Sequence, residues 1–366
     1  MPKRRPAKKR SLAAAVLLAV LCLLLLAVSR YLDSRSEPAA SVSAPEAAQA
    51  DASGLEVHFL DIGQGDSALL FCGDETLLID GGKVKNNQKL IARLKELEVD
   101  HLDAVICSHP DEDHCGGLSA VLASTRTDAF YCSVDSWHTK VFSDVTKYVA
   151  EQGISVTIPQ AGDTFAFSDA SVEFLGPVVD YGDDPNEGSL VARVRYGETS
   201  FLFTGDMGFE AEDDMLAAGV DVSATVLKVA HHGSAGSSST EFLQAVHPQY
   251  AVISVGADND YGHPTEAALN RLSACGIPVY RTDLLGEIIA VSDGKTVTIT
   301  SASNEAPPAS DAASQTAGSY GYVGNSSSKV VHLASCGKLP GENNRVYFET
   351  LEEAVAAGYR KHAGCL

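Results

Sequence analysis

Basic residues are scarce in this sequence. Its 366 residues include 27 Lys and Arg against 48 Asp and Glu, a formal net charge of −21. The first 35 residues hold eight of the basic residues and one acid, so the rest of the chain carries 19 basic and 47 acidic residues, a formal charge of −28. This excess of acid favours solubility and opposes non-specific attraction to polyanions, which counts against nucleic acid as a partner.

Paired cysteine spacing and internal repeats are also absent. The cysteines at positions 72, 107, 115, 132 and 275 lie in apolar contexts typical of strands and helices, so we expect small buried side chains, although an oxidising compartment would permit disulfides. No repeat of fixed period occurs. A chain of 366 residues is expected to form one large domain with appendages.

A long apolar run lies near the N-terminus. Six Lys and Arg within residues 1–10 precede an unbroken apolar stretch of 17 residues, from Leu12 to Val28. That length reaches the lower limit for a membrane-spanning helix and slightly exceeds a signal-peptide core. The small residues Ala48 and Ala50 lie too far downstream for ordinary cleavage. We therefore expect an uncleaved single-pass anchor, with the basic tail cytoplasmic and the remainder extracellular. The alternative is a cleaved signal and a secreted protein.

Composition divides the rest of the chain. Residues 36–53 and 303–319 are rich in Ser, Ala, Pro and Glu and are predicted to be linkers. The first linker follows a basic tail and anchor at 1–35. The second linker separates a core domain at 54–302 from a small C-terminal module at 320–366.

Strands and helices mix within the predicted core domain. Strands are predicted at Leu55–Leu60, Ser67–Phe71, Thr76–Ile79, Ala104–Cys107, Ala129–Cys132, Ser155–Ile158, Ser171–Leu175, Leu190–Tyr196, Thr199–Phe203, Thr225–Val229, Tyr250–Val255, Val279–Arg281, Glu287–Val291 and Thr296–Thr300. Helices are predicted at Gln88–Leu97, Gly117–Ser124, Phe142–Gln152, Phe209–Ala218, Thr240–Val246 and Thr265–Cys275. Many strands with about six helices indicate an α/β fold in which two sheets lie between helical layers.

One stretch concentrates potential metal ligands. Between residues 109 and 114 the sequence reads His-Pro-Asp-Glu-Asp-His, directly after an apolar strand and before a helix start. Imidazole suits zinc, manganese or iron, and carboxylates extend the choice to manganese and magnesium. Two histidines and two aspartates this close together favour a metal site over a solvated acidic loop.

Further polar residues end other predicted strands. They are Asp61, Gln64 and Asp66 around one turn, Asp80 before two glycines, Asp206 after Thr-Gly, and His231 with His232. An Asp–Gly pair alone indicates only a turn. Because each of these groups ends an apolar strand, we expect loops that gather on one edge of the sheets.

These segments resemble the five-part pattern of the metallo-β-lactamase superfamily, over about 54–302. Within this superfamily, the segments more specifically resemble the extracellular nuclease domain of ComEC-type DNA-uptake proteins. It is carried by Phe59–Asp66, His109–His114, Asn186–Val191, Leu202–Asp206, Leu227–Ser234, Tyr261–Pro264 and Arg281–Asp283. The resemblance implies an αββα four-layer sandwich with a two-metal site on one edge.

The resemblance also implies ligands for two divalent ions, zinc or manganese, with magnesium as a further choice. His109, Asp111 and Asp206 would hold one ion, and Asp113, His114, Asp206 and His231 the other, with His232 as the alternative to His231. Asp111 stands where the superfamily usually has a second histidine. Asn186 and Ser189 take the place of a further ligand histidine. Asp61, Gln64, Asp66 and Asp80 would support the site.

The implied activity is metal-dependent hydrolysis of phosphoesters, with DNA as the expected substrate. Our hypothesis is that a metal-activated hydroxide, oriented by Asp113, attacks phosphorus. Lys228 and His263 are candidates to contact phosphate or protonate the leaving group. Two alternatives stay open: a small-molecule phosphodiesterase, or a non-catalytic nucleic-acid-binding protein with a decayed metal site.

The C-terminal module carries a second group of potential ligands: His332, Cys336, His362 and Cys365. The module resembles the metal-binding domain of Ada-type DNA-repair proteins, which implies one structural zinc. A piece of this size has little core, so a metal would stabilise it. The alternative is a disulfide between Cys336 and Cys365.

Overall fold

The computed structural model describes residues 54–257, 259–303, 322–326, 328–333, 340–341, 344–348 and 351–362. The predicted anchor and the first linker lie outside these residues, as does most of the second linker. Within the described residues, no helix combines the length and apolar character needed to cross a membrane.

Eight strands form the first sheet. In sheet order they are β15 (Val297–Ser301), β14 (Ile288–Ser292), β1 (Leu55–Phe59), β2 (Ala68–Cys72), β3 (Glu75–Ile79), β4 (His101–Cys107), β5 (Arg126–Cys132) and β6 (Val156–Thr157). The pairs from β15 to β3 are antiparallel, whereas β3, β4, β5 and β6 run parallel.

Seven strands form the second sheet. Their order is β13 (Val279–Arg281), β12 (Tyr250–Ile253), β11 (Val226–Lys228), β10 (Thr199–Phe203), β9 (Val191–Tyr196), β8 (Ala170–Gly176) and β7 (Thr164–Phe167). The pairs from β7 to β10 are antiparallel, and β10 to β13 are parallel.

The two sheets pack face to face through alternating side chains. Leu77 of β3 lies in the cluster between the sheets, while the next residue, Leu78, packs under the outer helices. On the second sheet, Phe201 of β10 lies in the cluster between the sheets, and Leu202 packs under the outer helices. This period of two gives these strands two apolar faces, as a sheet covered on both sides requires.

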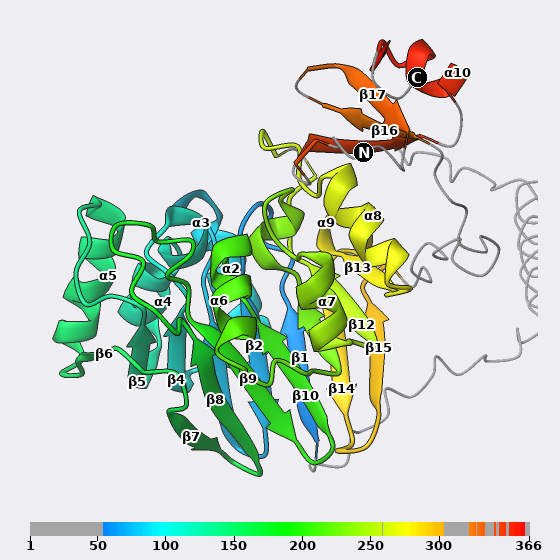
Figure 1. Cartoon of the computed structure of the whole chain (residues 1–366). Coiled ribbons are helices and arrows are strands. Elements are labelled where there is room, and N and C mark those ends of the chain that lie inside the picture. The colour runs from blue at the N-terminus through cyan, green and yellow to red at the C-terminus, as the bar shows by residue number, and fades with distance from the viewer. Residues whose placement is uncertain are drawn as a thin grey trace, which may run out of the picture. The chain divides into compact units, whose positions relative to one another are not determined.

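Helices cover the outer face of each sheet (Figure 1). On the first sheet, the cluster includes residues of α2 (Asn87–Glu96), α4 (Leu118–Ser124) and α5 (Lys140–Glu151). On the second, it includes residues of α6 (Phe209–Ala217), α7 (Thr240–Val246) and α8 (Glu266–Ala274). The predicted α/β class with an αββα sandwich is confirmed.

Most predicted elements of the core domain lie within a few residues of the observed ones. The exceptions in this domain are short. Strand β7 was not predicted, because only one of its four residues is buried and it pairs with β8 alone. The four-residue helices α3 (Glu112–Cys115) and α9 (Thr282–Leu285) and the 3₁₀ turns η1 (Val84–Asn86) and η2 (Ala230–Gly233) were also missed. Segments this short present no helical period to detect.

The C-terminal module has its own small sheet. Its order is β18 (Arg345–Phe348), β16 (Tyr322–Asn325), β17 (Val330–Leu333) and β19 (Arg360–Lys361), accompanied by α10 (Leu351–Ala356). Its buried cluster consists of Val331, Phe348, Ala354 and Tyr359. So small a core stabilises a module only weakly.

Candidate metal centre

Strand direction brings the predicted ligands to one edge of the sandwich. Strands β3 and β4 run parallel, so the loops beginning at Asp80 and at Ser108 leave from the same edge. In the other sheet β10 and β11 run parallel, and they lead to Asp206 and to His232. Because antiparallel β2 starts where β3 ends, Asp66 also lies at this edge. The carboxyl ends of parallel strands commonly form ligand sites.

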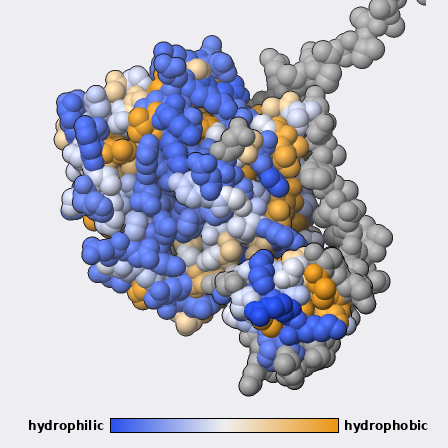
Figure 2. Space-filling view, turned by 90° about the horizontal axis from the view of Figure 1, so that it is seen from above, coloured by the Kyte–Doolittle hydropathy of each residue, from blue (hydrophilic) through white to orange (hydrophobic). Residues whose placement is uncertain are grey.

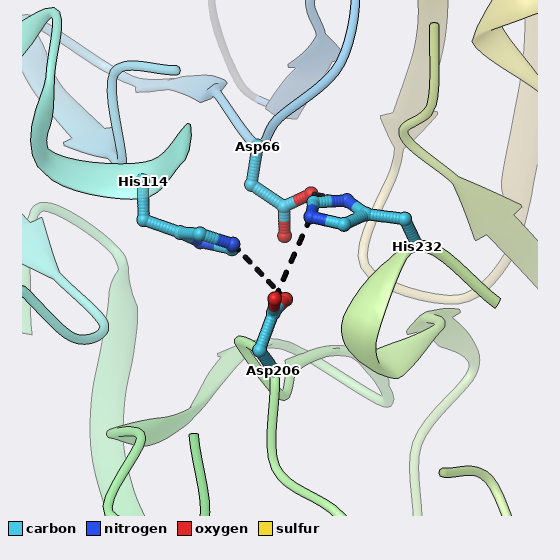
Figure 3. Close-up of side chains that lie close together, drawn as sticks. All are labelled: Asp66, His114, Asp206 and His232. Atoms are coloured by element: carbon cyan, nitrogen blue, oxygen red, sulfur yellow. Dashed lines mark ion pairs between the residues drawn. The ribbon is translucent and has the colours of Figure 1, made fainter. Parts of the chain in front are cut away.

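Four buried side chains converge there. Asp66, His114, Asp206 and His232 each offer a ligand atom, and these atoms all lie within 4.8 Å of one another. His114 Nε2 lies 3.0 Å from one oxygen of Asp206, and His232 Nε2 lies 3.5 Å from the other. Figure 3 shows Asp206 lying between the two imidazole rings. The two sheets therefore meet at a single group of metal-binding atoms.

Asp80 supports this group from behind. One of its oxygens accepts a hydrogen bond from the Ser108 backbone N–H at 2.7 Å, and the other lies 2.8 Å from Nδ1 of His114. The contact fixes the ring and leaves Nε2 of His114 directed at the centre. A carboxylate behind a ligand histidine commonly fixes its tautomer in metal sites.

The fit to a metal can be judged from the buried ring nitrogens. Among the described residues, Nε2 of His109 is buried and makes no hydrogen bond, while the buried Nε2 atoms of His114 and His232 face the carboxylate of Asp206 at 3.0 and 3.5 Å. Buried polar atoms without partners are costly, and three imidazoles with carboxylates form a donor set for zinc, manganese or iron. The residues present therefore fit a divalent metal.

Carboxylates and histidines lie close together in this group and shift one another's pKa values. Burial acts to lower the pKa of His232, but the carboxylates of Asp206 and Asp66 outweigh it and raise the pKa to about 9. Burial, reinforced by the charge of His114, lowers the pKa of His109 to about 3. Burial would raise the pKa of Asp206, yet the neighbouring histidines hold it well below its usual range. Without metal, protons on histidines balance the carboxylates, and a bound cation would replace them.

A sequence model described as the metallo-beta-lactamase superfamily matches residues 60–257, more than half of the chain. The chain belongs to this superfamily. The match contains every strand end that forms the metal centre. It does not reach the C-terminal module, whose resemblance to Ada-type domains stays a prediction.

Two curated relatives are similar to the metallo-β-lactamase part of the chain. ComE operon protein 3 of Bacillus subtilis (strain 168) is 31% identical over 251 residues, which cover 64% of this chain and 32% of that protein. Competence protein ComA of Neisseria gonorrhoeae is 36% identical over 230 residues, covering 62% and 31%. The chain thus spans about a third of the length of these relatives. The predicted resemblance to the superfamily and to competence proteins is confirmed.

A solved structure, the metallo-beta-lactamase fold protein YhfI from Bacillus subtilis, is 13% identical with a TM-score of 0.44, covering 68% of this chain and all of that one.

The remaining residues of the superfamily's histidine-rich loop surround the buried group. His109 is fully buried, and its Nε2 lies 4.0 Å from the half-exposed Asp111. Asp113 reaches the centre from the start of α3, with one oxygen 3.7 Å from Nε2 of His232. The loop therefore places its two outer histidines inside and its carboxylates toward the open side.

The adjacent histidines differ in position. His232 is 1% exposed and belongs to the buried group, with Nδ1 2.9 Å from the backbone oxygen of Ser254. His231 is about one third exposed, and its Nε2 lies 3.6 Å from Asp206. Both residues have left-handed backbone angles, φ 50° and 53°, which the sequence did not signal. His231 was the expected ligand, whereas the structure brings His232 deeper into the centre.

The two residues expected to contact phosphate, Lys228 and His263, lie in different environments. Lys228 is buried and lies 2.7 Å from Asp66, while its ammonium group donates to the Val229 backbone oxygen at 2.8 Å. This placement differs from the expected role, because Lys228 holds Asp66 and does not face solvent. His263 is partly buried, with its ring centroid 5.5 Å from that of His231. Burial and the nearby histidines lower the pKa of His263 to about 4.

The expected supporting residues lie in three places. Ser189 is fully buried; its hydroxyl lies 3.3 Å from Nδ1 of His109 and accepts a hydrogen bond from the Asp206 backbone N–H. Gln64 accepts from the Gly256 backbone N–H at 3.2 Å. The remaining two, Asp61 and Asn186, lie outside the buried group: Asp61 pairs with Lys89 at 2.8 Å, and Asn186 has a buried side-chain oxygen.

Two contributors were not predicted. Glu212 of α6 is buried and accepts hydrogen bonds from the backbone N–H groups of Ser238 and Ser239, which fixes the loop after His232. Lys83 follows the Gly81-Gly82 turn, with its ammonium nitrogen 3.8 Å from Asp113. The lysine-rich composition after Asp80 was the available signal for Lys83. A buried glutamate inside an acidic helix gives no signal in sequence.

In the C-terminal module, only two of the four predicted ligands are described. The rings of His332 and His362 stack with centroids 4.1 Å apart. Cys336 and Cys365 lie outside the described residues. The structural zinc and the alternative disulfide therefore stay predictions.

Proposed function

We propose that this domain is a metal-dependent phosphodiesterase that cleaves DNA with two divalent ions. The observation that carries the proposal is the buried group of Asp66, His114, Asp206 and His232 at the edge where both sheets end, together with the buried ring of His109, whose centroid lies 4.1 Å from that of His114. Such a donor set suits the two-metal chemistry of phosphoester hydrolysis.

The proposed ligands divide between two positions. His109 and Asp111 would hold one ion, Asp113, His114 and His232 would hold the other, and Asp206 would serve both. The ring of His114 is held by the contact of its Nδ1 with Asp80, 2.8 Å away. Zinc or manganese fits these donors best.

Bound ions would supply a water of lowered pKa and positive charge for the phosphoryl oxygens. The chain's own residues do the rest. Asp113, near the open side of the centre, orients the attacking water. His263 contacts a phosphate oxygen of the substrate, and the pair formed by Lys228 and Asp66 positions His232.

The relatives named as competence proteins favour DNA as the substrate. With the predicted anchor, the domain would act on DNA outside the cell membrane. The test is hydrolysis of labelled single- and double-stranded DNA by the purified chain with added manganese, magnesium or zinc. Cleavage that requires metal and disappears with EDTA is expected. No cleavage with any of the three ions would overturn the proposal.

One observation favours a second candidate, a small-molecule phosphodiesterase. Residues 54–303 contain 38 acidic and 14 basic residues, so few side chains are available to neutralise a polyanion. Bis(p-nitrophenyl) phosphate discriminates between the candidates. Turnover of this diester without any cleavage of DNA would favour the second.

A further inference from the structure

One segment next to the metal centre is positively charged, whereas the domain as a whole is negatively charged. Residues 81–95 contain five Lys and Arg and no acid, although residues 54–303 as a whole have 38 acids against 14 basic residues. The segment starts at the Gly81-Gly82 turn after β3 and continues through η1 into α2. A third of the domain's positive charge therefore follows directly from the strand end that carries Asp80.

Lys83 brings this charge to the centre itself. Its ammonium nitrogen lies 3.8 Å from Asp113, and it donates a hydrogen bond to the Tyr261 hydroxyl at 3.2 Å. Its side chain keeps 17% of its surface exposed. Lys83 therefore keeps contact with solvent at the rim of the centre, whereas Lys228 is buried.

Tyr261 presents an aromatic ring to solvent at the same rim. It is 59% exposed, which is unusual for a large aromatic side chain. Its ring stacks on His263 with centroids 5.7 Å apart and planes at 24°. His263 in turn lies beside His231, whose Nε2 is 3.6 Å from Asp206. The three rings form a row from solvent to the centre.

The loop that carries this ring is fixed by Asn259. Its side-chain oxygen accepts hydrogen bonds from the backbone N–H groups of Tyr261 and His263, at 3.2 and 2.9 Å. Its amide nitrogen donates to the backbone oxygens of Gly256 and His263. An ordered loop holds an exposed ring at little entropic cost on binding, which is a property of recognition surfaces.

A polar ligand suits this rim. Seen from above, the surface of the domain is mainly hydrophilic, with apolar residues in separate groups (Figure 2). A cation next to an exposed aromatic ring is the combination that binds single-stranded nucleic acid, in which phosphate meets the cation and a base stacks on the ring.

We propose that Lys83 and Tyr261 form a nucleotide-binding subsite for single-stranded nucleic acid: Lys83 binds the phosphate next to the scissile one, and Tyr261 stacks the adjoining base. The subsite deepens the proposed function and rests on it. It selects an unpaired strand, because a base paired within a duplex cannot leave its stack to meet the ring without cost.

The test uses the full chain and two substrates. Binding is measured without cleavage, in EDTA, by the fluorescence of a single-stranded oligodeoxynucleotide that contains 2-aminopurine. Cleavage of the same oligonucleotide and of bis(p-nitrophenyl) phosphate is measured with metal. Tyr261→Leu is expected to weaken oligonucleotide binding by roughly 5- to 100-fold, as for loss of one stacked base, and to abolish the quenching of 2-aminopurine.

Conservative variants separate this role from a structural one. Tyr261→Phe keeps the ring and should bind the oligonucleotide nearly as the wild type does. Lys83→Met should raise KM for the oligonucleotide about tenfold with little change in kcat, and Lys83→Arg should restore it. Lys140→Met, a remote and exposed site on α5, is the charge-matched control.

The two proposals fail in different ways. If the wild type hydrolyses neither substrate, the proposed function is wrong, whatever the binding data show. If the wild type cleaves the oligonucleotide while Tyr261→Leu keeps wild-type affinity, quenching and KM, the subsite is wrong and the proposed function stands.

Discussion

Single carboxylates at this centre each contact several groups. Asp80 contacts Ser108 and His114, and Asp66 lies between Lys228 and His232. Asp206 contacts histidines from both sheets. Because each partner is buried, loss of one carboxylate leaves several polar atoms unpaired, and the cost is larger than for a surface ion pair.

Asp206→Asn is expected to reduce metal content below one ion per chain and to lower hydrolysis by at least about 100-fold, since the amide cannot bridge two cations. The measurements are the number of metal ions per chain, by mass spectrometry, and the rate of hydrolysis of the substrate that the wild type cleaves. Asp144→Asn, at an exposed ion pair on α5, is the matched control. Full metal loading with an unchanged rate in Asp206→Asn would contradict the bridging role.

Glu212 gives a prediction about stability and pH. Burial raises its pKa to about 7 from 4.5, although two backbone N–H groups donate to it. The folded state therefore binds this proton more tightly than the unfolded chain, and the glutamate's contribution to stability falls as pH rises from about 4.5 to about 7.

Glu212→Gln removes this titration. Between pH 4.5 and 7.5, the free energy of unfolding of the variant should rise relative to wild type by about 3 kcal/mol. Urea unfolding at several pH values measures it, with the exposed Glu241→Gln on α7 as a surface control. A constant difference between Glu212→Gln and wild type would show that Glu212 does not titrate in this range.

Loops and turns at strand ends set the position of the ligands. Gly205, between β10 and Asp206, has φ 51°, and a Cβ there would lie 2.9 Å from the Cβ atoms of Ser108 and Ser189. The turn therefore needs glycine both for its backbone angle and for close packing between loops of the two sheets.

Gly205→Ala tests this packing against a control with a similar backbone angle. Gly276, with φ 69°, has nothing within 4 Å of the point that a Cβ would occupy, so Gly276→Ala should cost only about 1 kcal/mol. Gly205→Ala should cost roughly 1–3 kcal/mol more and weaken metal binding, because Asp206 must shift. Chemical unfolding and metal titration measure both effects. Equal costs at the two glycines would refute the close packing.

The positions of most strands, and the grouping of the loops at their ends, could be predicted from the sequence. Strong apolar alternation placed nearly all strands, and because strand ends share an edge, it also grouped the loop at 109–114 with Asp206. The choice between His231 and His232 could not be predicted, because it depends on two left-handed residues that no composition signals. Lys228 lies on the inward face with Val226, but its partner Asp66 comes from the other sheet, so only the tertiary structure identifies the ion pair.

Across the whole molecule, the metal centre joins the two sheets. His109, Asp113 and His114 follow β4 of the eight-stranded sheet, whereas Asp206 and His232 follow strands of the seven-stranded sheet. Bound metal would therefore link the two halves of the sandwich. Anything that binds only the folded state stabilises it by mass action.

Removal of metal should thus lower the melting temperature of the full chain. At a metal concentration about 100 times Kd, binding contributes about 2.7 kcal/mol. For a domain of this size, EDTA should lower Tm by roughly 5–10 °C. Calorimetry with and without metal measures the shift. Asp206→Asn should respond weakly, and an equal response in that variant would place the stabilising metal elsewhere.

The net charge of the domain predicts an unusually shallow dependence of DNA binding on salt. Each phosphate neutralised on a single strand contributes about −0.7 to the slope of log K against log salt. Residues 54–303 have 14 basic residues against 38 acidic ones, and several of the basic residues are in ion pairs. We therefore expect contacts with about two or three phosphates. We expect a slope of about −1.5 to −2. Lys83→Met should reduce its magnitude by about 0.7, whereas Lys140→Met should not. A slope steeper than about −5 would require a basic surface that residues 54–303 do not supply, and would point to another part of the chain as the main DNA contact.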